Sequence, residues 1–290
     1  MEARQILGGG EIVSAKGKAL YLPKPEAKEG YSLVASARNG PLTDLEVGRL
    51  RLLNRGQNKY QSETGEREVV LYILTGKCNV EAKGPWGTRK FEAVGERNNV
   101  FAAPPSAVIV PPDTKYTVTV AGTSVDIFVA GVPIDDRAKS PAVVRPQDVE
   151  IHYVGEGNHR REVRAIPGWD GKGGRSRIGE TINPPGGWSA WPRHPFDNQP
   201  ELAPGFEEVF LFLTKPKDGW GLHRSSGYYS NGETIDDTWL VRNGDYAMAS
   251  LGDRFVVAAP NTTVLYVWAY IAPVPEVYPT WAEDLGEYSA

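Results

Sequence analysis

Short apolar runs separated by Gly, Pro and Asn fill the first half of the chain. Within them Val, Ile, Leu and Tyr follow one another or alternate with polar residues, as they do in buried and half-buried β-strands. These runs are 46-EVGRLRLL-53, 68-EVVLYILTGKCNVEAK-83, 100-VFAAPPSAVIVPP-112, 115-KYTVTVA-121 and 124-SVDIFVAG-131. Their length and spacing predict a β-sandwich or β-barrel.

A second set of strand-like runs follows a polar, proline-containing stretch that is typical of a connection between domains. This set comprises 161-REVRAI-166, 175-RSRIGETI-182, 208-EVFLFL-213, 238-TWLV-241, 245-DYAMAS-250, 255-FVVAA-259 and 263-TVLYVWAYIA-272. Each half contains a Glu-Val run followed by a Gly-containing turn, at Glu68 and Glu208, which indicates a duplicated β-domain. We therefore expect an all-β chain with two tandem β-barrel or jelly-roll domains, at residues 1–132 and 154–290, joined by a linker at 133–153.

Composition and charge narrow the function classes. The 290 residues carry a net charge of −4, without the basic stripe of a nucleic-acid-binding protein. The basic cluster 160-RREVR-164 alternates with strand period, which favours a solvated strand face over a phosphate site. No apolar run approaches the ~20 residues needed to cross a bilayer, and the N-terminus lacks the apolar core of a signal peptide. We expect a soluble, cytoplasmic protein without a nucleic-acid or membrane partner.

Cysteine and histidine are scarce. Cys78 is the only cysteine, which excludes an intrachain disulfide and favours a buried structural role for its thiol. The histidines, at 152, 159, 194 and 223, show no metal-ligand spacing, and none lies in the first 150 residues. The N-terminal barrel is therefore expected to lack a metal site and to have a structural or oligomerising role, which makes a homo-oligomer the expected assembly.

Several segments resemble, in order and spacing, the bacterial 5-deoxy-glucuronate isomerase family of inositol catabolism. They are 75-TGKCNVE-81, 94-VGERNNVFAAPPSAVIVPPDTKYTVTVA-121, 154-VGEGNHRREVRAI-166, 184-PPGGWSAWPRHPFD-197, 207-EEVFLF-212 and 235-IDDTWLVRNGD-245. The resemblance covers most of the chain, and it implies a bicupin, in which two cupin barrels follow each other and the second carries the active site.

In that family the second cupin holds a divalent metal through three histidines and a glutamate. The resemblance places these ligands at His194, Phe196, Glu208 and Arg254, so two of the four positions cannot coordinate a metal. A divalent ion normally takes at least three protein ligands, and a guanidinium repels it. We expect no metal cofactor here, unless another residue such as His223 or Asp197 supplies a third ligand beside His194 and Glu208.

The same positions suggest the candidate site. Glu208 opens an apolar run, so a carboxylate facing the barrel interior needs a partner, and Arg254 or Arg193 is the expected one. An ion pair between Glu208 and Arg254 would either close a disused pocket or serve catalysis, with Glu208 or His194 as the base and Arg254 or Arg193 as the cation. His194 could equally be a rim histidine bonded to a carbonyl. The expected substrate-binding aromatics are Trp188, Trp191, Phe196 and Tyr229, although most aromatic side chains fill β-barrel cores.

Three functions remain open at this point. The first is an isomerase-like cupin that transfers a proton between the aldose and ketose forms of a small acidic sugar, without metal. The second is a repurposed metal-free cupin enzyme performing an isomerisation, elimination or cyclisation on another small molecule. The third is a non-catalytic cupin that binds a small acid or sugar. A likeness of fold does not decide among them, because the residues around the reacting atoms have changed.

Overall fold

A computed structural model describes residues 12–13, 19–26, 28–135, 139–166, 176–189, 207–228, 234–249 and 253–271. These residues form strands and two single turns of 3-10 helix, η1 (Pro146–Asp148) and η2 (Gly157–His159). The predicted all-β class is confirmed. In the described ranges no helix is long and apolar enough to span a membrane.

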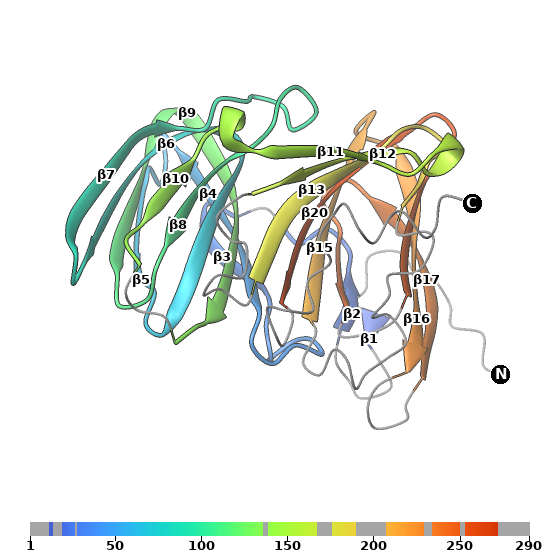
Figure 1. Cartoon of the computed structure of the whole chain (residues 1–290), viewed down its shortest axis with the longest axis horizontal. Helices are drawn as coiled ribbons and strands as arrows, with labels where there is room; N and C mark the ends of the chain where they lie inside the picture. The colour runs from blue at the N-terminus through green and yellow to red at the C-terminus, as the bar shows by residue number, and fades with distance from the viewer. Residues whose placement is uncertain are drawn as a thin grey trace.

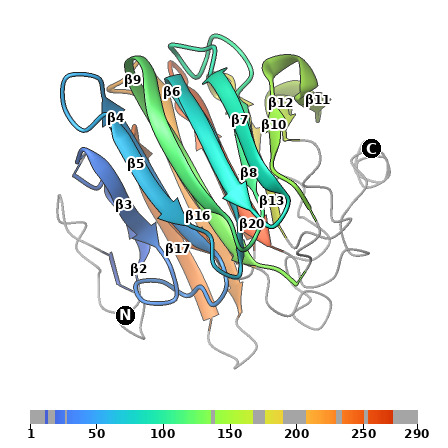
Figure 2. The same ribbon diagram turned by 90° about the vertical axis from the view of Figure 1, so that its left-hand side faces the viewer.

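The first half forms one sheet that bends over itself. Its strands are β3 (Gly30–Ala35), β4 (Glu46–Leu53), β5 (Lys59–Glu63), β6 (Arg67–Gly84), β7 (Gly87–Val94), β8 (Ser106–Val110), β9 (Lys115–Pro133) and β10 (Ala142–Val144). They are ordered β10-β8-β6-β9-β4-β3, with β5 added to β9 and β7 added to β6. The long strands β6 and β9 pair antiparallel and run side by side (Figure 2).

The bend in β6 depends on a glycine. The β6–β9 register shifts between Ile73 and Thr75 and again between Gly76 and Cys78. Gly76 has a φ of +82°, and a Cβ atom there would lie 2.1 Å from the Ser124 carbonyl oxygen. Only glycine fits this left-handed position and close approach. The folded sheet encloses an apolar core that includes Cys78, whose predicted burial is confirmed.

The second half consists of two facing sheets. The larger contains β1 (Ile12–Val13), β2 (Ala19–Leu22), β18 (Tyr246–Ala249), β15 (Glu207–Lys215), β20 (Thr263–Ile271), β13 (Ser176–Asn183), β12 (Arg161–Ala165) and β11 (Glu150–Val154) in that order. The smaller contains β14 (Trp188–Ser189), β19 (Asp253–Ala258), β16 (Trp220–Tyr228) and β17 (Thr234–Arg242). Between them lies a core rich in aromatic side chains, namely Phe210, Phe212, Trp239, Tyr266 and Trp268.

The two eight-stranded sheets pack against each other across the middle of the molecule (Figure 1). One apolar cluster joins them, with Tyr72 and Phe128 from the first half and Val209, Leu211 and Val267 from the second. Strands such as β15 are therefore buried on both faces. Alternate residues of these strands pack in two different cores, one inside the second half and one between the halves.

The domain boundaries at 132 and 154 stay a prediction. The strand pairing shows which half of the molecule the segments near them join. β2 pairs with β18, with Tyr21 opposite Ala247, so the N-terminal segment adds a strand to the second half. Within the expected linker, β10 pairs with β8 of the first half. The strand β11, at its end, pairs with β12 of the second half.

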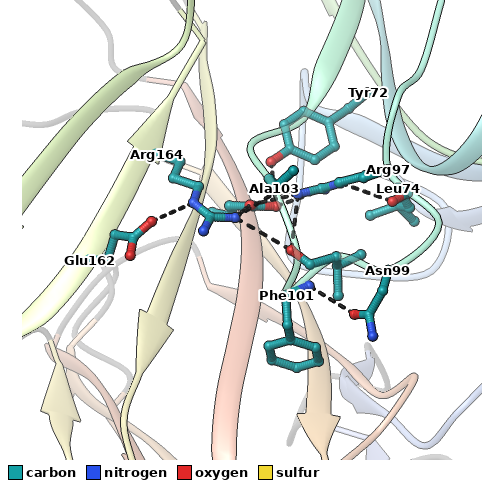
Figure 3. Close-up of polar contacts among 10 residues, drawn as sticks. Tyr72, Leu74, Arg97, Asn99, Phe101, Ala103, Glu162 and Arg164 are labelled. Carbon is teal, nitrogen blue, oxygen red and sulfur yellow. Dashed lines mark hydrogen bonds and ion pairs between the residues drawn. The ribbon is translucent and has the colours of Figure 1, made fainter. Parts of the chain in front are cut away.

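The basic cluster at 160–164 is solvated only in part, because Arg160 is exposed and Arg161 partly exposed, whereas Arg164 is buried. Arg164 on β12 is buried and contacts Glu162 and Glu180, and the loop after β7 brings Arg97 to the same place (Figure 3). The prediction was wrong for Arg164, because the sequence does not show that Glu180, on the neighbouring strand, supplies the charge that this arginine needs when it is buried.

Candidate active site

The two glutamates that open β15 point in opposite directions, as consecutive strand residues must. The Glu207 carboxylate faces the first half and accepts hydrogen bonds from the backbone N–H groups of Thr43, Asp44 and Leu45, at 2.6 to 3.1 Å. The Glu208 side chain lies on the same side of β15 as Phe210 and Phe212, which belong to the core of the second half. Glu207 thus anchors the start of β15 to the first half. The Glu208 side chain points into the interior of the second half.

Glu208 forms an ion pair with Arg254 of β19. The distance from Arg254 Nε to Glu208 Oε2 is 3.0 Å, and each side chain is only 9% exposed. The two residues come from different sheets, so the pair bridges the two layers of the second half. The expected Glu208–Arg254 ion pair is therefore present, and it places a fixed positive charge and a carboxylate together in a mostly dehydrated interior.

His223 on β16 lies in the same interior and is completely buried. Its ring stacks on Trp239 with centroids 5.7 Å apart, and its Nδ1 lies 3.2 Å from the Phe255 carbonyl oxygen. Burial, reinforced by the charge of Arg254, lowers the pKa of His223 to about 3. The imidazole is therefore neutral at neutral pH. With its Nδ1 hydrogen donated to the carbonyl, Nε2 is a hydrogen-bond acceptor that has no partner among the described residues.

Several hydroxyl groups line the same core. The Tyr266 hydroxyl donates to Ser189 Oγ at 2.9 Å, and Trp268 Nε1 donates to Thr181 Oγ1 at 3.0 Å. Ser189 is buried, while its neighbour Trp188 is 40% exposed. β14 therefore presents Ser189 to the interior and leaves Trp188 partly exposed, and the expected substrate-binding role of Trp188 stays a prediction.

Five of the expected site residues lie outside the described residues: His194, Arg193, Trp191, Phe196 and Tyr229. Their proposed roles stay predictions. Of the remaining ones, the structure brings Glu208 and Arg254 together. It also adds His223, considered from the sequence only as a substitute metal ligand, as a neighbour of Arg254.

The described residues do not fit the divalent metal that the cupin family implies. They include no group of three or more His, Cys, Asp or Glu side chains positioned to hold an ion. In addition, Glu208 Oε2 is already bound by the guanidinium of Arg254, which would repel a cation.

Comparison with known proteins agrees with this architecture. The KduI/IolB family model matches residues 21–287. The chain is 30% identical over 227 residues to the 5-deoxy-glucuronate isomerase of Geobacillus kaustophilus, which covers 77% of this chain and 78% of the relative. It is 26% identical over 265 residues to the corresponding protein of Shouchella clausii, covering 89% of this chain and 93% of the relative.

Among solved structures, the chain is similar to an IolB-like protein of Salmonella typhimurium, with a TM-score of 0.78 and 22% identity over 93% of this chain and 99% of the other. It is also similar to the oxalate decarboxylase of Lactobacillus farciminis, with a TM-score of 0.58 and 11% identity over 90% and 88%. At these identities the likeness concerns the fold alone. The predicted bicupin fold is confirmed.

Proposed function

Because this chain belongs to the KduI/IolB family, we propose that it is an isomerase that interconverts the aldose and ketose forms of a small acidic sugar, using Glu208 and Arg254 in place of a bound metal. The observation that carries the proposal is the ion pair between these residues inside the second cupin. The curated relatives are named 5-deoxy-glucuronate isomerases, so 5-deoxy-glucuronate is the first substrate to test.

Arg254 supplies the cation that the reaction needs. Removal of a proton from the carbon next to a carbonyl places negative charge on the carbonyl oxygen, and the resulting enediolate needs an electrostatic partner. A guanidinium stays charged and offers several donors in a fixed plane, so it suits both an enediolate and a substrate carboxylate. Its burial in the core strengthens this interaction, because fewer water molecules screen it.

Glu208 is the proposed base. Its carboxylate is held by Arg254 until substrate arrives, and an anionic substrate would compete for the same guanidinium. The released carboxylate takes the proton from C2 and returns it to C1, while the hydroxyl hydrogen on O2 moves to O1, so that no atom is gained or lost. His194 remains an alternative base and Arg193 an alternative cation, as the sequence suggests.

The deciding experiment compares turnover and binding in Glu208→Gln. Purified protein is incubated with 5-deoxy-glucuronate in D2O, and NMR follows product formation and deuterium incorporation at the carbon next to the carbonyl. Calorimetry measures affinity for the same compound. We expect turnover to fall by roughly 10²-fold or more, the usual contribution of a general base, while affinity changes only a few-fold.

Asp236→Asn is the matched control, because Asp236 forms an exposed ion pair with Arg224 on the smaller sheet of the same half. Its turnover should equal that of the unmodified protein. Full turnover in Glu208→Gln would refute the role of Glu208. Binding without turnover or deuterium exchange in the unmodified protein would instead support a non-catalytic sugar-binding cupin. Absence of both binding and turnover would indicate another substrate, as expected for a repurposed cupin enzyme.

A further inference from the structure

A second polar site lies at the interface of the two halves, away from Glu208. It is a cleft of about 580 Å³, lined by residues of β4, by the segment after β2 and by the end of β15. This volume falls within the range of roughly 300–1,000 Å³ that is usual for small-molecule sites. Lys215 in the cleft lies seven residues beyond Glu208 on the same strand, roughly 23 Å away at ~3.3 Å per residue.

The cleft is strongly basic, although the whole chain has a net charge of −4. It contains two acidic side chains and six basic ones, the latter being Lys24, Lys28, Arg49, Arg51, Lys215 and Lys217. Both carboxylates already have cationic partners. Asp126 binds Arg49 through two hydrogen bonds and also lies 3.7 Å from Arg51, and Glu26 lies 3.6 Å from Lys28.

Three cations in the cleft have no carboxylate within ion-pair distance among the described residues: Lys24, Lys215 and Lys217. Like charges gathered in one concave site repel one another, and the low-dielectric walls of a cleft focus their field. A bound anion would therefore best offset the surplus of positive charge in the cleft. Because Lys215 and Lys217 come from the second half and Arg51 from the first, a bound anion would contact both halves.

A buried tyrosine also lines this cleft. Tyr246, which is nearly inaccessible to solvent, lines it, and its oxygen accepts a hydrogen bond from Arg49 Nη1 at 3.1 Å. The hydrogen of the same hydroxyl has no acceptor among the described residues. A buried donor that lacks an acceptor is costly, so the hydroxyl is best satisfied by an acceptor atom that enters the cleft.

We propose that this cleft is a binding site for a small organic polyanion bearing phosphate or carboxylate groups, held by Lys215, Lys217 and Lys24 and hydrogen-bonded by Tyr246. The site is independent of the proposed isomerase activity. Occupancy joins the two halves and so stabilises the folded chain, since a ligand that binds only the native state raises its melting temperature.

Calorimetric titration of the full-length protein with sodium pyrophosphate and, separately, with citrate tests the proposal and distinguishes phosphate from carboxylate ligands. Sodium chloride at matched ionic strength controls for screening. We expect one saturable site for at least one anion, with an affinity at least tenfold weaker in Lys215→Gln/Lys217→Gln. The double variant Lys83→Gln/Lys90→Gln removes two exposed lysines elsewhere, both paired with Glu81, and should bind as the unmodified protein does.

Tyr246→Phe removes one hydroxyl and no charge, so it separates a built site from a merely basic surface. A several-fold loss of affinity with an unchanged circular dichroism spectrum supports the proposal. Absence of saturable binding by either anion, or equal weakening in both lysine double variants, overturns it. Full affinity in Tyr246→Phe would overturn the role given to the hydroxyl.

Discussion

Arg97 and Glu180 form a buried two-point ion pair between the two halves of the molecule. Arg97 Nη1 and Nη2 donate to Glu180 Oε1 and Oε2 at 2.7 and 2.9 Å, and the side chains are 1% and 0% exposed. Arg164 donates to the same Oε1 at 2.9 Å, and the Tyr72 hydroxyl donates to Oε2 at 2.8 Å (Figure 3 shows the two arginines). The single carboxylate of Glu180 thus partly neutralises the charges of both arginines in the core that joins the two sheets.

Glu180→Gln should destabilise the protein strongly. The change leaves Arg97 buried without its counter-charge, and removal of one partner from a buried ion pair typically costs about 3–5 kcal/mol of unfolding free energy. Urea denaturation followed by tryptophan fluorescence measures the loss. Glu162→Gln is the matched control, because among the described residues Glu162 pairs with Arg164 alone and its side chain is 24% exposed, so we expect a loss of about 1 kcal/mol or less.

Tyr72→Phe extends the test if Glu180→Gln does not fold. It deletes only the hydroxyl that donates to Glu180, a hydrogen bond to a charged acceptor whose removal should cost about 1.5–3 kcal/mol. Losses in Glu180→Gln no larger than those in Glu162→Gln would mean that the cluster does not hold the halves together.

His223 should make stability depend on pH. The folded chain keeps this imidazole neutral because burial lowers its pKa to about 3, whereas the unfolded chain binds a proton near the ordinary pKa of about 6.5. Between these values the unfolded state holds more protons, so stability rises with pH. The contribution is complete above about pH 6.5 and is lost as the pH falls toward 3, by at most ~1.4 kcal/mol per pH unit.

Denaturant unfolding of the unmodified protein and of His223→Phe, between about pH 6 and pH 4.5, measures this slope. In His223→Phe this slope should be smaller by up to ~1.4 kcal/mol per pH unit, whatever the absolute stability of the variant. Phenylalanine suits the site because the ring already packs against Phe210, Phe212 and Trp239. Equal slopes in His223→Phe and the unmodified protein would contradict the burial of a neutral imidazole.

The strands could be predicted because their apolar runs are long and the turns between them are marked by Gly and Pro. The Glu208–Arg254 pair could be predicted as well, since a carboxylate at the start of an apolar run needs a cation and Arg254 was already suggested by the resemblance. The first inference rests on local sequence, and the second rests on the resemblance together with the cost of burying an unpaired charge.

The burial of Arg164 and His223 could not be predicted in the same way. On β16 the apolar residues Trp220 and Leu222 are exposed, while His223 and Ser225 are buried, so the strand inverts the usual relation of hydropathy to burial. Polar groups enter a core when distant residues supply partners, as Phe255 does for His223 and Glu180 for Arg164. Such partners are set by strand pairing, which periodicity alone does not reveal.

Metal binding by the protein and its variants tests whether Arg254 occupies the position of a metal ligand in the family. The chain as it is should retain no stoichiometric Mn, Fe, Zn or Ni after incubation and desalting, as measured by elemental mass spectrometry. Arg254→His removes the repelling charge and frees the Glu208 carboxylate, and together with His194 it offers three ligands. Arg254→His/Phe196→His offers a fourth and should bind a divalent ion near stoichiometrically. Arg254→Gln, which removes the charge without adding an imidazole, is the control. If the double variant is folded, as judged by circular dichroism, and still retains no metal, the correspondence of Phe196 and Arg254 with the family's ligand positions is wrong.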